Sequence, residues 1–176
     1  MFFILKKMLF TGIVLSFCVG LLFAQTAVAP AAGDGSEGNP YQIASLENLY
    51  WIDQQADQWR NMHCIQVADI DASETANWED EEGKGWKPFG YYSLGAYGLY
   101  MYDGNNHTIN GLYIDRDSTN YVGLFGLVFN LKNLKMTNAY IRGSYYVGVI
   151  AGNVYYRLDN CSVENCTVIG VYSVGG

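Results

Sequence analysis

The sequence has few cysteines and no pair of them in the C-x-x-C spacing of zinc and redox sites. One of the four, Cys18, lies in the apolar N-terminal segment, which leaves Cys64, Cys161 and Cys166. An odd number without that spacing argues against a disulfide framework or a structural zinc site. We expect Cys161 and Cys166 to be small hydrophobic core residues, and a bridge between them is the alternative.

Catalytic and ligand-binding motifs are absent as well. The sequence has no G-x-S-x-G, P-loop, Rossmann fingerprint, H-E-x-x-H or EF-hand loop. The two histidines, His63 and His107, are far apart in sequence, and we expect them at the surface or at chain corners. These absences predict a protein that is not an enzyme and needs no cofactor. Calcium held by Asp69, Asp71 or the acidic run 79–82 is the alternative, since hard cations prefer several carboxylates.

An excess of basic residues is also missing. The chain has 10 Lys and Arg against 17 Asp and Glu, a net charge of −7. Removal of an N-terminal segment that contains Lys6 and Lys7 leaves 8 basic residues against 17 acidic ones, or −9. Such a charge repels phosphate backbones and anionic membranes, which excludes nucleic acid as a partner.

The N-terminal segment 1–24 has the pattern of an export signal. Two lysines precede an apolar run over residues 8–23, and small residues follow. The run is shorter than the roughly 20 residues that a spanning helix needs, so no membrane span is expected after cleavage. A lipoprotein signal ending at Cys18 is the rival, but Phe17 stands where a small residue is needed. We expect a signal peptide over 1–24, export through the Sec pathway, and a secreted or cell-surface protein.

One helical pattern follows the signal. Residues 25–40 are rich in Ala, Gly and Pro and predict a flexible leader. Ser45 can cap a helix over 45–59, whose apolar residues recur at a spacing near 3.6. Beyond it, a polar acidic loop is expected at 72–90. Short β-branched or Tyr/Gly-rich runs predict strands at 64–71, 97–102 and 107–114.

A repeated phrase near the C-terminus indicates the architecture. Tyr121-Val122-Gly123 returns as Tyr146-Val147-Gly148, and a partial third copy, Val174-Gly175, follows. Six apolar or glycine positions also recur at one constant spacing: Leu131, Leu134, Met136, Ala139, Ile141 and Gly143 return as Leu158, Cys161, Val163, Cys166, Val168 and Gly170. A period in the mid-twenties is typical of a stacked repeat. We assign 41–118 to an N-terminal cap and first coils, and 119–176 to repeats.

The spacing within each repeat predicts strands and corners. Apolar residues two apart share one face of a strand, and Thr137-Asn138 suits a corner between two such pairs. We therefore expect an all-β fold, a right-handed parallel β-helix of about 25–27 residues per coil with a short N-terminal capping helix. Tyr121 and Tyr146 would then stack about 4.8 Å apart. Gly123 and Gly148 would stand at corners where a Cβ is not tolerated.

Gly123-Leu124-Phe125-Gly126 resembles the GLUG motif of secreted bacterial repeat proteins. The segments 39–49, 68–73, 85–90 and 102–112 are similar to the leader that such proteins often carry. The second copy, Gly148-Val149-Ile150-Ala151-Gly152, departs by one inserted residue. The resemblance implies a parallel β-helix with an N-terminal cap, in large adhesin-like surface or secreted proteins. It marks these structural motif residues: Gly123, Leu124, Phe125, Gly126, Tyr146, Val147, Gly148 and Gly175.

An enzyme is the alternative, because parallel β-helices also include polysaccharide lyases and hydrolases. Its catalytic coil would be missing from this chain or lie within 69–117. The candidate residues are Asp69 with Asp71, and the cluster Asp115, Arg116 and Asp117. We expect them instead to end strands and turn corners, since the repeats bring no acid, base and cation into register.

Fifteen tyrosines leave a binding role open. In regular strand, Tyr91-Tyr92, Tyr145-Tyr146 and Tyr155-Tyr156 each point one ring outward, where aromatic ladders stack on sugars or contact proteins. The sequence therefore predicts a non-enzymatic exported module, an adhesin-like binding surface or structural scaffold. Its expected partners are a carbohydrate or protein surface and the rest of a longer repeat array. We expect the array to be truncated here, because the third copy carries no cap.

Overall fold

The chain folds mostly into β-strands. The computed structural model describes residues 25–92 and 95–175, so the expected signal peptide lies outside the described residues. Three short helical segments occur in the described part: α1 (Leu46–Asp53), η1 (Ala56–Asn61) and η2 (Ser73–Asn77). None of the helices described is long and apolar enough to cross a membrane. The predicted all-β class is confirmed.

Three sheets contain most of the strands. The first comprises β1 (Tyr41–Ile43), β2 (His63–Gln66), β8 (Leu99–Asp103), β11 (Phe125–Lys132) and β15 (Ala151–Asp159). The second comprises β3 (Ile70–Asp71), β9 (Thr108–Asn110), β12 (Lys135–Thr137) and β16 (Ser162–Glu164). The third comprises β4 (Glu79–Asp80), β5 (Gly83–Gly85), β10 (Tyr113–Asp115), β13 (Tyr140–Arg142) and β17 (Thr167–Ile169). Two smaller pairs are β14 (Tyr145–Gly148) with β18 (Tyr172–Gly175), and β6 (Tyr91–Tyr92) with β7 (Ala96–Tyr97).

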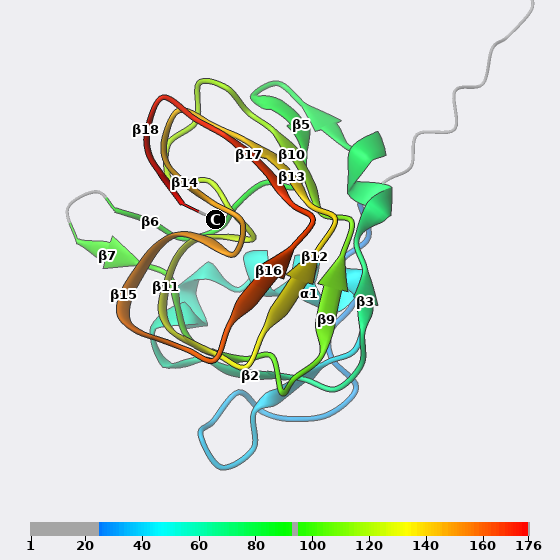
Figure 1. Cartoon of the computed structure of the whole chain (residues 1–176). Helices are drawn as coiled ribbons and strands as arrows, with labels where there is room; N and C mark the ends of the chain where they lie inside the picture. Colours follow the sequence, from blue (N-terminus) through cyan, green and yellow to red (C-terminus); the bar gives the residue numbers. More distant parts are fainter. Residues whose placement is uncertain (1–24, 93–94, 176) are drawn as a thin grey trace, which may run out of the picture.

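The chain passes through the three sheets in the same order three times. It runs β8, β9, β10, then β11, β12, β13, then β15, β16, β17, and successive strands of each sheet pair in parallel. Tyr113 lies beside Tyr140, and Tyr140 beside Thr167, so each step between partners equals the spacing found in the sequence. In Figure 1 these strands lie one behind another, with α1 behind them. In the second and third sheets the sequence period is therefore the pairing register, whereas in the first sheet β8 and β11 pair 29 residues apart, as Leu99 with Val128.

A residue in the left-handed backbone conformation stands at each corner between sheets. The three corners repeat in Asn106, Asn133 and Asn160, in Gly111, Asn138 and Asn165, and in Tyr121, Tyr146 and Ser173, with φ between 49° and 76°. Gly and Asn adopt this conformation readily, which explains their recurrence at two corners. The predicted corner at Asn138 is confirmed. At the third corner the left-handed residue is a tyrosine, whereas we had expected the corner at Gly123 and Gly148.

The helix α1 covers the interior at the N-terminal end. Ser45 Oγ accepts a hydrogen bond from the Asn48 N–H at 3.3 Å, as its predicted cap role requires. The buried face of α1 joins the common hydrophobic core. The helix is shorter than predicted, because the chain tightens into η1 after Asp53. There the buried Trp59 indole donates to the Ile52 carbonyl at 2.7 Å.

Residues 25–40, expected to be a flexible leader, make specific contacts instead. The Asn48 side chain donates to the Val28 carbonyl at 2.9 Å, and the Gln42 N–H donates to the Ala32 carbonyl at 3.0 Å. The His63 N–H donates to the Gly35 carbonyl at 2.9 Å. Because these are mainly backbone interactions, they require no side-chain periodicity that a sequence could display.

The segment 72–90, expected to be a polar loop, is ordered around a buried cation. Its hairpin β4–β5 pairs antiparallel with β10. Arg116, expected to end a strand or turn a corner, is 1% exposed behind this hairpin. Its guanidinium donates to both Asp80 carboxylate oxygens at 2.8 Å and to the carbonyls of Trp86 and Gly85 at 3.0 and 3.1 Å. The acidic hairpin thereby closes one edge of the third sheet.

Asp80→Asn is expected to lower the free energy of unfolding by about 2 kcal/mol, since it leaves the Arg116 charge buried without its counterion. The Arg116 hydrogen bonds hold the pKa of Asp80 below its ordinary value. This contribution is therefore present above pH about 4 and is lost as the pH falls through the lowered pKa. Urea unfolding at neutral and acid pH measures both effects.

The matched control is Glu82→Gln in the same hairpin. Glu82 pairs with Lys87 at 2.8 Å, but both side chains are more than half exposed. Such a pair contributes at most about 1 kcal/mol. Equal losses in the two variants at neutral pH would contradict the structural role of Asp80.

Candidate functional site

The motif Gly123-Leu124-Phe125-Gly126 leads the chain from the third corner into β11. Leu124 and Phe125 are fully buried. A Cβ on Gly123 would lie 2.7 Å from the Gly148 carbonyl oxygen, and one on Gly126 would collide with the Gly90 carbonyl. The two glycines therefore allow close backbone approach, while the residues between them fill the core.

The second copy of the motif pairs with the third. Val147 is the register partner of Val174, and Gly148 of Gly175. The inserted residue shifts the pairing at this corner. Val122 pairs with Val147, whereas the partner of Phe125 is Ala151, one position beyond the residue that an unbroken register would supply. The surrounding register thus absorbs the insertion.

Asp69 and Asp71, considered for catalysis, both accept backbone hydrogen bonds. Asp69 accepts the Thr108 N–H at 2.8 Å and lies 3.3 Å from His107 Nδ1, and Asp71 accepts the Ser73 N–H at 2.9 Å. These backbone hydrogen bonds lower the pKa of both carboxyls, the opposite of what a general acid requires. Asp71 therefore has the geometry of a turn residue, whereas Asp69 joins the segment before β3 to the start of β9.

The second charged cluster is divided by the fold. Arg116 lies buried against Asp80, whereas Asp115 and Asp117 both face Arg142, at 3.1 and 3.2 Å. Arg142 lies one repeat further along the chain and is the register partner of Asp115. These contacts join neighbouring strands.

The acidic run 79–82 is largely paired with cations. Glu79 contacts Lys84 at 3.7 Å, and the Asp80 and Glu82 pairs are described above. His63 and His107 stay apart, on β2 and at the first corner. Within the described chain, no group of three or more His, Cys, Asp or Glu side chains is arranged to hold a metal ion.

The three described cysteines are free thiols. Cys64 is buried, and burial raises the pKa of its thiol well above the ordinary value. Cys161 and Cys166 are partly buried and donate to the carbonyls of Asp159 and Glu164, each at 3.3 Å. They are not bridged to each other, and they pack against the core as predicted.

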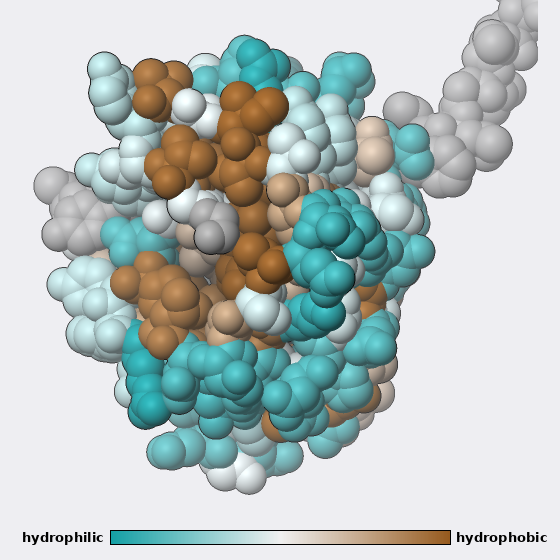
Figure 2. All heavy atoms as spheres, in the orientation of Figure 1, coloured by the Kyte–Doolittle hydropathy of each residue, from teal (hydrophilic) through white to brown (hydrophobic). Residues whose placement is uncertain are grey.

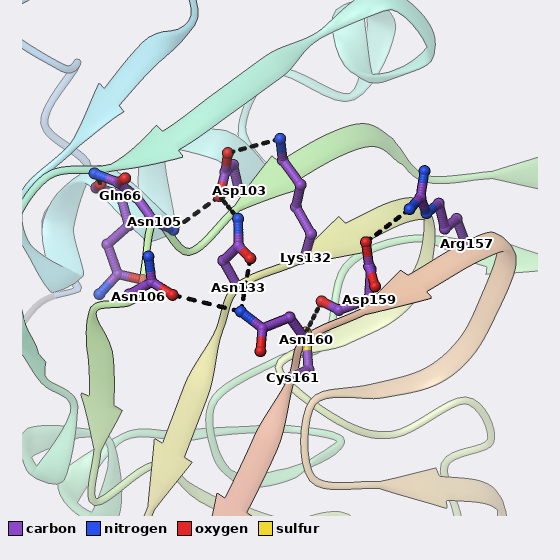
Figure 3. A network of polar contacts seen from close by, with 10 residues as sticks. All are labelled: Gln66, Asp103, Asn105, Asn106, Lys132, Asn133, Arg157, Asp159, Asn160 and Cys161. Atoms are coloured by element: carbon purple, nitrogen blue, oxygen red, sulfur yellow. Dashed lines mark hydrogen bonds and ion pairs between the residues drawn. The ribbon is translucent and has the colours of Figure 1, made fainter.

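A polar ladder crosses the strands at the first corner (Figure 3). The Asn160 carboxamide donates to Asn133 Oδ1 at 2.9 Å, and the Asn133 carboxamide donates to Asp103 Oδ1 at 3.0 Å. Lys132 pairs with the other Asp103 oxygen at 3.0 Å. Although burial opposes it, hydrogen bonds from Asn133 and Lys132 keep the pKa of Asp103 below its ordinary value. The ladder joins one repeat to the next at the position where the backbone is left-handed.

Tyrosine rings stack on one another from one repeat to the next. Tyr121 and Tyr146 stack with centroids 4.8 Å apart and planes 8° apart, which confirms the predicted ladder. Both rings of Tyr145-Tyr146 and of Tyr155-Tyr156 are exposed, although one ring of each pair was expected to point inward. The left-handed Tyr146 and a register shift between Val128 and Asn130 break the strand alternation there.

The strands β15–β18 leave an apolar end open. Leu158 is 57% exposed, whereas Leu131, its partner one repeat earlier, is 1% exposed. The other inward positions of the last repeat are also more exposed than their partners. They surround a hollow of about 490 Å³ lined by residues such as Val149, Val163 and Val174. Figure 2 shows these hydrophobic residues running through the middle of this face, bordered by hydrophilic ones.

Two known proteins are similar to this chain over a small part of their own length. No family model matches the chain. The chain is 35% identical over 148 residues to halomucin of Haloquadratum walsbyi. It is 32% identical over 140 residues to a protein of Evansella cellulosilytica provisionally named a Gly-rich membrane protein. These matches cover 82% and 76% of this chain but only 2% and 15% of the relatives. The chain thus spans a small part of each relative's length.

A solved structure shares the fold. It is a Bacteroides ovatus protein provisionally named an immunoglobulin A1 protease, with a TM-score of 0.56 and 18% identity. The match covers 78% of this chain and 44% of that one. At this identity the likeness shows the fold alone.

The polar ladder can be tested at Asn133, whose φ is +54°. Asn133→Ala removes these hydrogen bonds and puts alanine, which has no polar side chain to offset the strain, in the left-handed conformation. We therefore expect the free energy of unfolding to fall by about 2–3 kcal/mol. Asn133→Gly removes the same hydrogen bonds but tolerates the conformation, and should cost about 1 kcal/mol. Urea unfolding of both variants separates the two terms, and a greater loss for glycine would contradict this account.

Proposed function

We propose that this chain is a non-enzymatic exported module of the GLUG-motif repeat family, folded as a right-handed parallel β-helix with a short N-terminal capping helix. It serves outside the cell or at its surface as an adhesin-like binding or structural scaffold. The chain passes through three sheets in constant order, and its successive strands pair in parallel. The register of the second and third sheets equals the sequence period, and these features together support this architecture. A right-handed path is the rule for parallel crossover connections.

The observation that carries the proposal is the contrast between equivalent inward positions. Met136 and Ile141 are fully buried, whereas their register partners Val163 and Val168 are partly exposed at the open end. In repeat proteins such a face is covered by the next repeat or by a cap. Asn160, last in the polar ladder, also presents the carboxamide oxygen to which the ladder's next donor would bond.

Export and surface location rest on the sequence pattern of residues 1–24 and on the relatives. One relative is named a membrane protein, and both are much longer than this chain. We therefore propose that the chain acts within a longer array, in which the rest of the array is its first partner.

The array is tested by lengthening the protein. A copy of residues 149–175 appended after Gly175 continues the register, since Gly148 pairs with Gly175. We expect the added repeat to raise the free energy of unfolding by about 2 kcal/mol, because it buries side chains such as Leu158. A copy of the same segment with its sequence scrambled is the control. A gain that the scrambled copy reproduces, or no gain, would sink the proposal.

The enzyme alternative has its own test. The protein is incubated with acidic and neutral polysaccharides, and new reducing or unsaturated ends are measured. We expect no such ends to appear. Release of such ends that Asp69→Asn or Asp115→Asn abolishes would establish the enzyme instead.

A further inference from the structure

A continuous run of aromatic rings crosses the outer face of the first sheet. His63 of β2 lies 5.2 Å from Tyr100 of β8, which lies 6.4 Å from Phe129 of β11. Phe129 in turn lies 5.3 Å from both Tyr155 and Tyr156 of β15. We call Tyr100, Phe129, Tyr155 and Tyr156 the aromatic strip. Its rings come from three adjacent strands, so the strip extends across repeats.

The rings of the strip are oriented differently from those of the stacked ladders. In the ladders, Tyr113 lies 13° from the plane of Tyr140, and Tyr145 lies 24° from Tyr172, so each ring covers a face of the next. In the strip the interplanar angles are 34° to 77°. Tyr156 is 66% exposed. Phe129 at the centre of the strip is 9% exposed, whereas solvent reaches the tilted rings of the three tyrosines around it.

A register shift contributes to this arrangement. The pairing of β11 with β15 slips between Val128 and Asn130, which places two tyrosines against the single Phe129. Such a bulge re-aims side chains that regular alternation would send inward. The slip therefore accounts for the placement of Tyr155 and Tyr156, whereas Tyr100 and Phe129, which face each other in regular register, are tilted by 34° without it.

A polar groove of about 220 Å³ borders the strip. It is lined by Met101, Asn130, Leu131, Lys132, Arg157 and Asp159. Each cation in it already has a carboxylate partner: Arg157 lies 2.7 Å from Asp159, and Lys132 lies 3.0 Å from Asp103. The groove thus offers hydrogen-bond donors and acceptors with little net charge, and the negative chain as a whole repels polyanions.

We propose that the aromatic strip and its groove bind a neutral polysaccharide. Sugar rings stack on the open faces of Tyr100 and Tyr156, and sugar hydroxyls bond to the Arg157–Asp159 pair. Apolar ring faces beside paired polar groups suit a ligand that has both surfaces and no charge. This inference rests on the proposed role of the chain as an exposed surface module, and it names the ligand class for that role.

Native gel electrophoresis of the purified protein tests this proposal. The gels contain hydroxyethylcellulose, galactomannan or dextran, and polygalacturonate serves as the anionic comparator. We expect at least one neutral polymer to retard the protein. Tyr100→Ala with Tyr156→Ala should weaken this binding about tenfold, the loss typical of a binding hot spot. Arg157→Leu should weaken it without altering a ring, and Tyr156→Phe should preserve it.

The matched control is Tyr172→Ala. The exposed fraction of Tyr172, 62%, is similar to that of Tyr156, but Tyr172 belongs to a stacked ladder with Tyr145. Its loss should leave binding unchanged, and circular dichroism checks that every variant is folded. The proposal is overturned if no neutral polymer binds the folded protein, if only polygalacturonate binds, or if Tyr172→Ala weakens binding as much as the strip variant. If no neutral polysaccharide binds but the appended repeat still stabilises the protein, the proposed ligand is wrong and the proposed array still stands.

Discussion

In-register pairing of parallel strands is the constraint on which the rest of this structure depends. It places each residue roughly 4.8 Å from its equivalent in the next repeat. Apolar positions therefore meet apolar ones, as Ile114 meets Ile141. Charged positions must alternate in sign, because like charges directly opposite each other are destabilising. The ladder Asp103, Lys132 and Asp159 satisfies that requirement, as does Asp115 with Arg142.

The stack of paired strands is covered at its N-terminal end and open at the other. At the N-terminal end, α1 covers the interior and the acidic hairpin pairs antiparallel with β10, which closes an edge that parallel strands would leave open. At the other end of the described chain, β15, β16, β17 and β18 are the outermost strands of their sheets, and apolar side chains such as Leu158 and Val174 are exposed. The same geometry that stabilises the interior thus creates a surface suited to another repeat. The bulge in β15 is the local exception, and it places the exposed Tyr155 and Tyr156 of the aromatic strip against the single Phe129.

The sequence predicted the features that repeat or that follow a local rule, and it missed the contacts between distant segments outside the repeats. The Ser45 cap, the Asn138 corner and the Tyr121–Tyr146 ladder follow local rules or the period, and each is confirmed. The pairing of Asp80 with Arg116 joins two distant segments outside any repeat, so no sequence pattern predicts it. The left-handed Tyr146 and the β15 bulge were missed for a different reason, since both depart from regular strand alternation. A one-residue excess in the second motif copy was the one signal that pointed to irregular pairing near β15.

Native-state hydrogen exchange at two amides tests the stacking account most directly. The Tyr140 N–H donates to the Leu112 carbonyl at 2.9 Å, and the Thr167 N–H donates to the Ala139 carbonyl at 2.8 Å. The two residues are register partners one repeat apart. Their hydrogen bonds differ chiefly in position, because β17 packs outside β13 whereas β17 is the outermost strand of the sheet. If stability comes from neighbouring repeats, Thr167 opens from the free end and Tyr140 exchanges at least about tenfold more slowly. Equal exchange at the two amides would contradict the account.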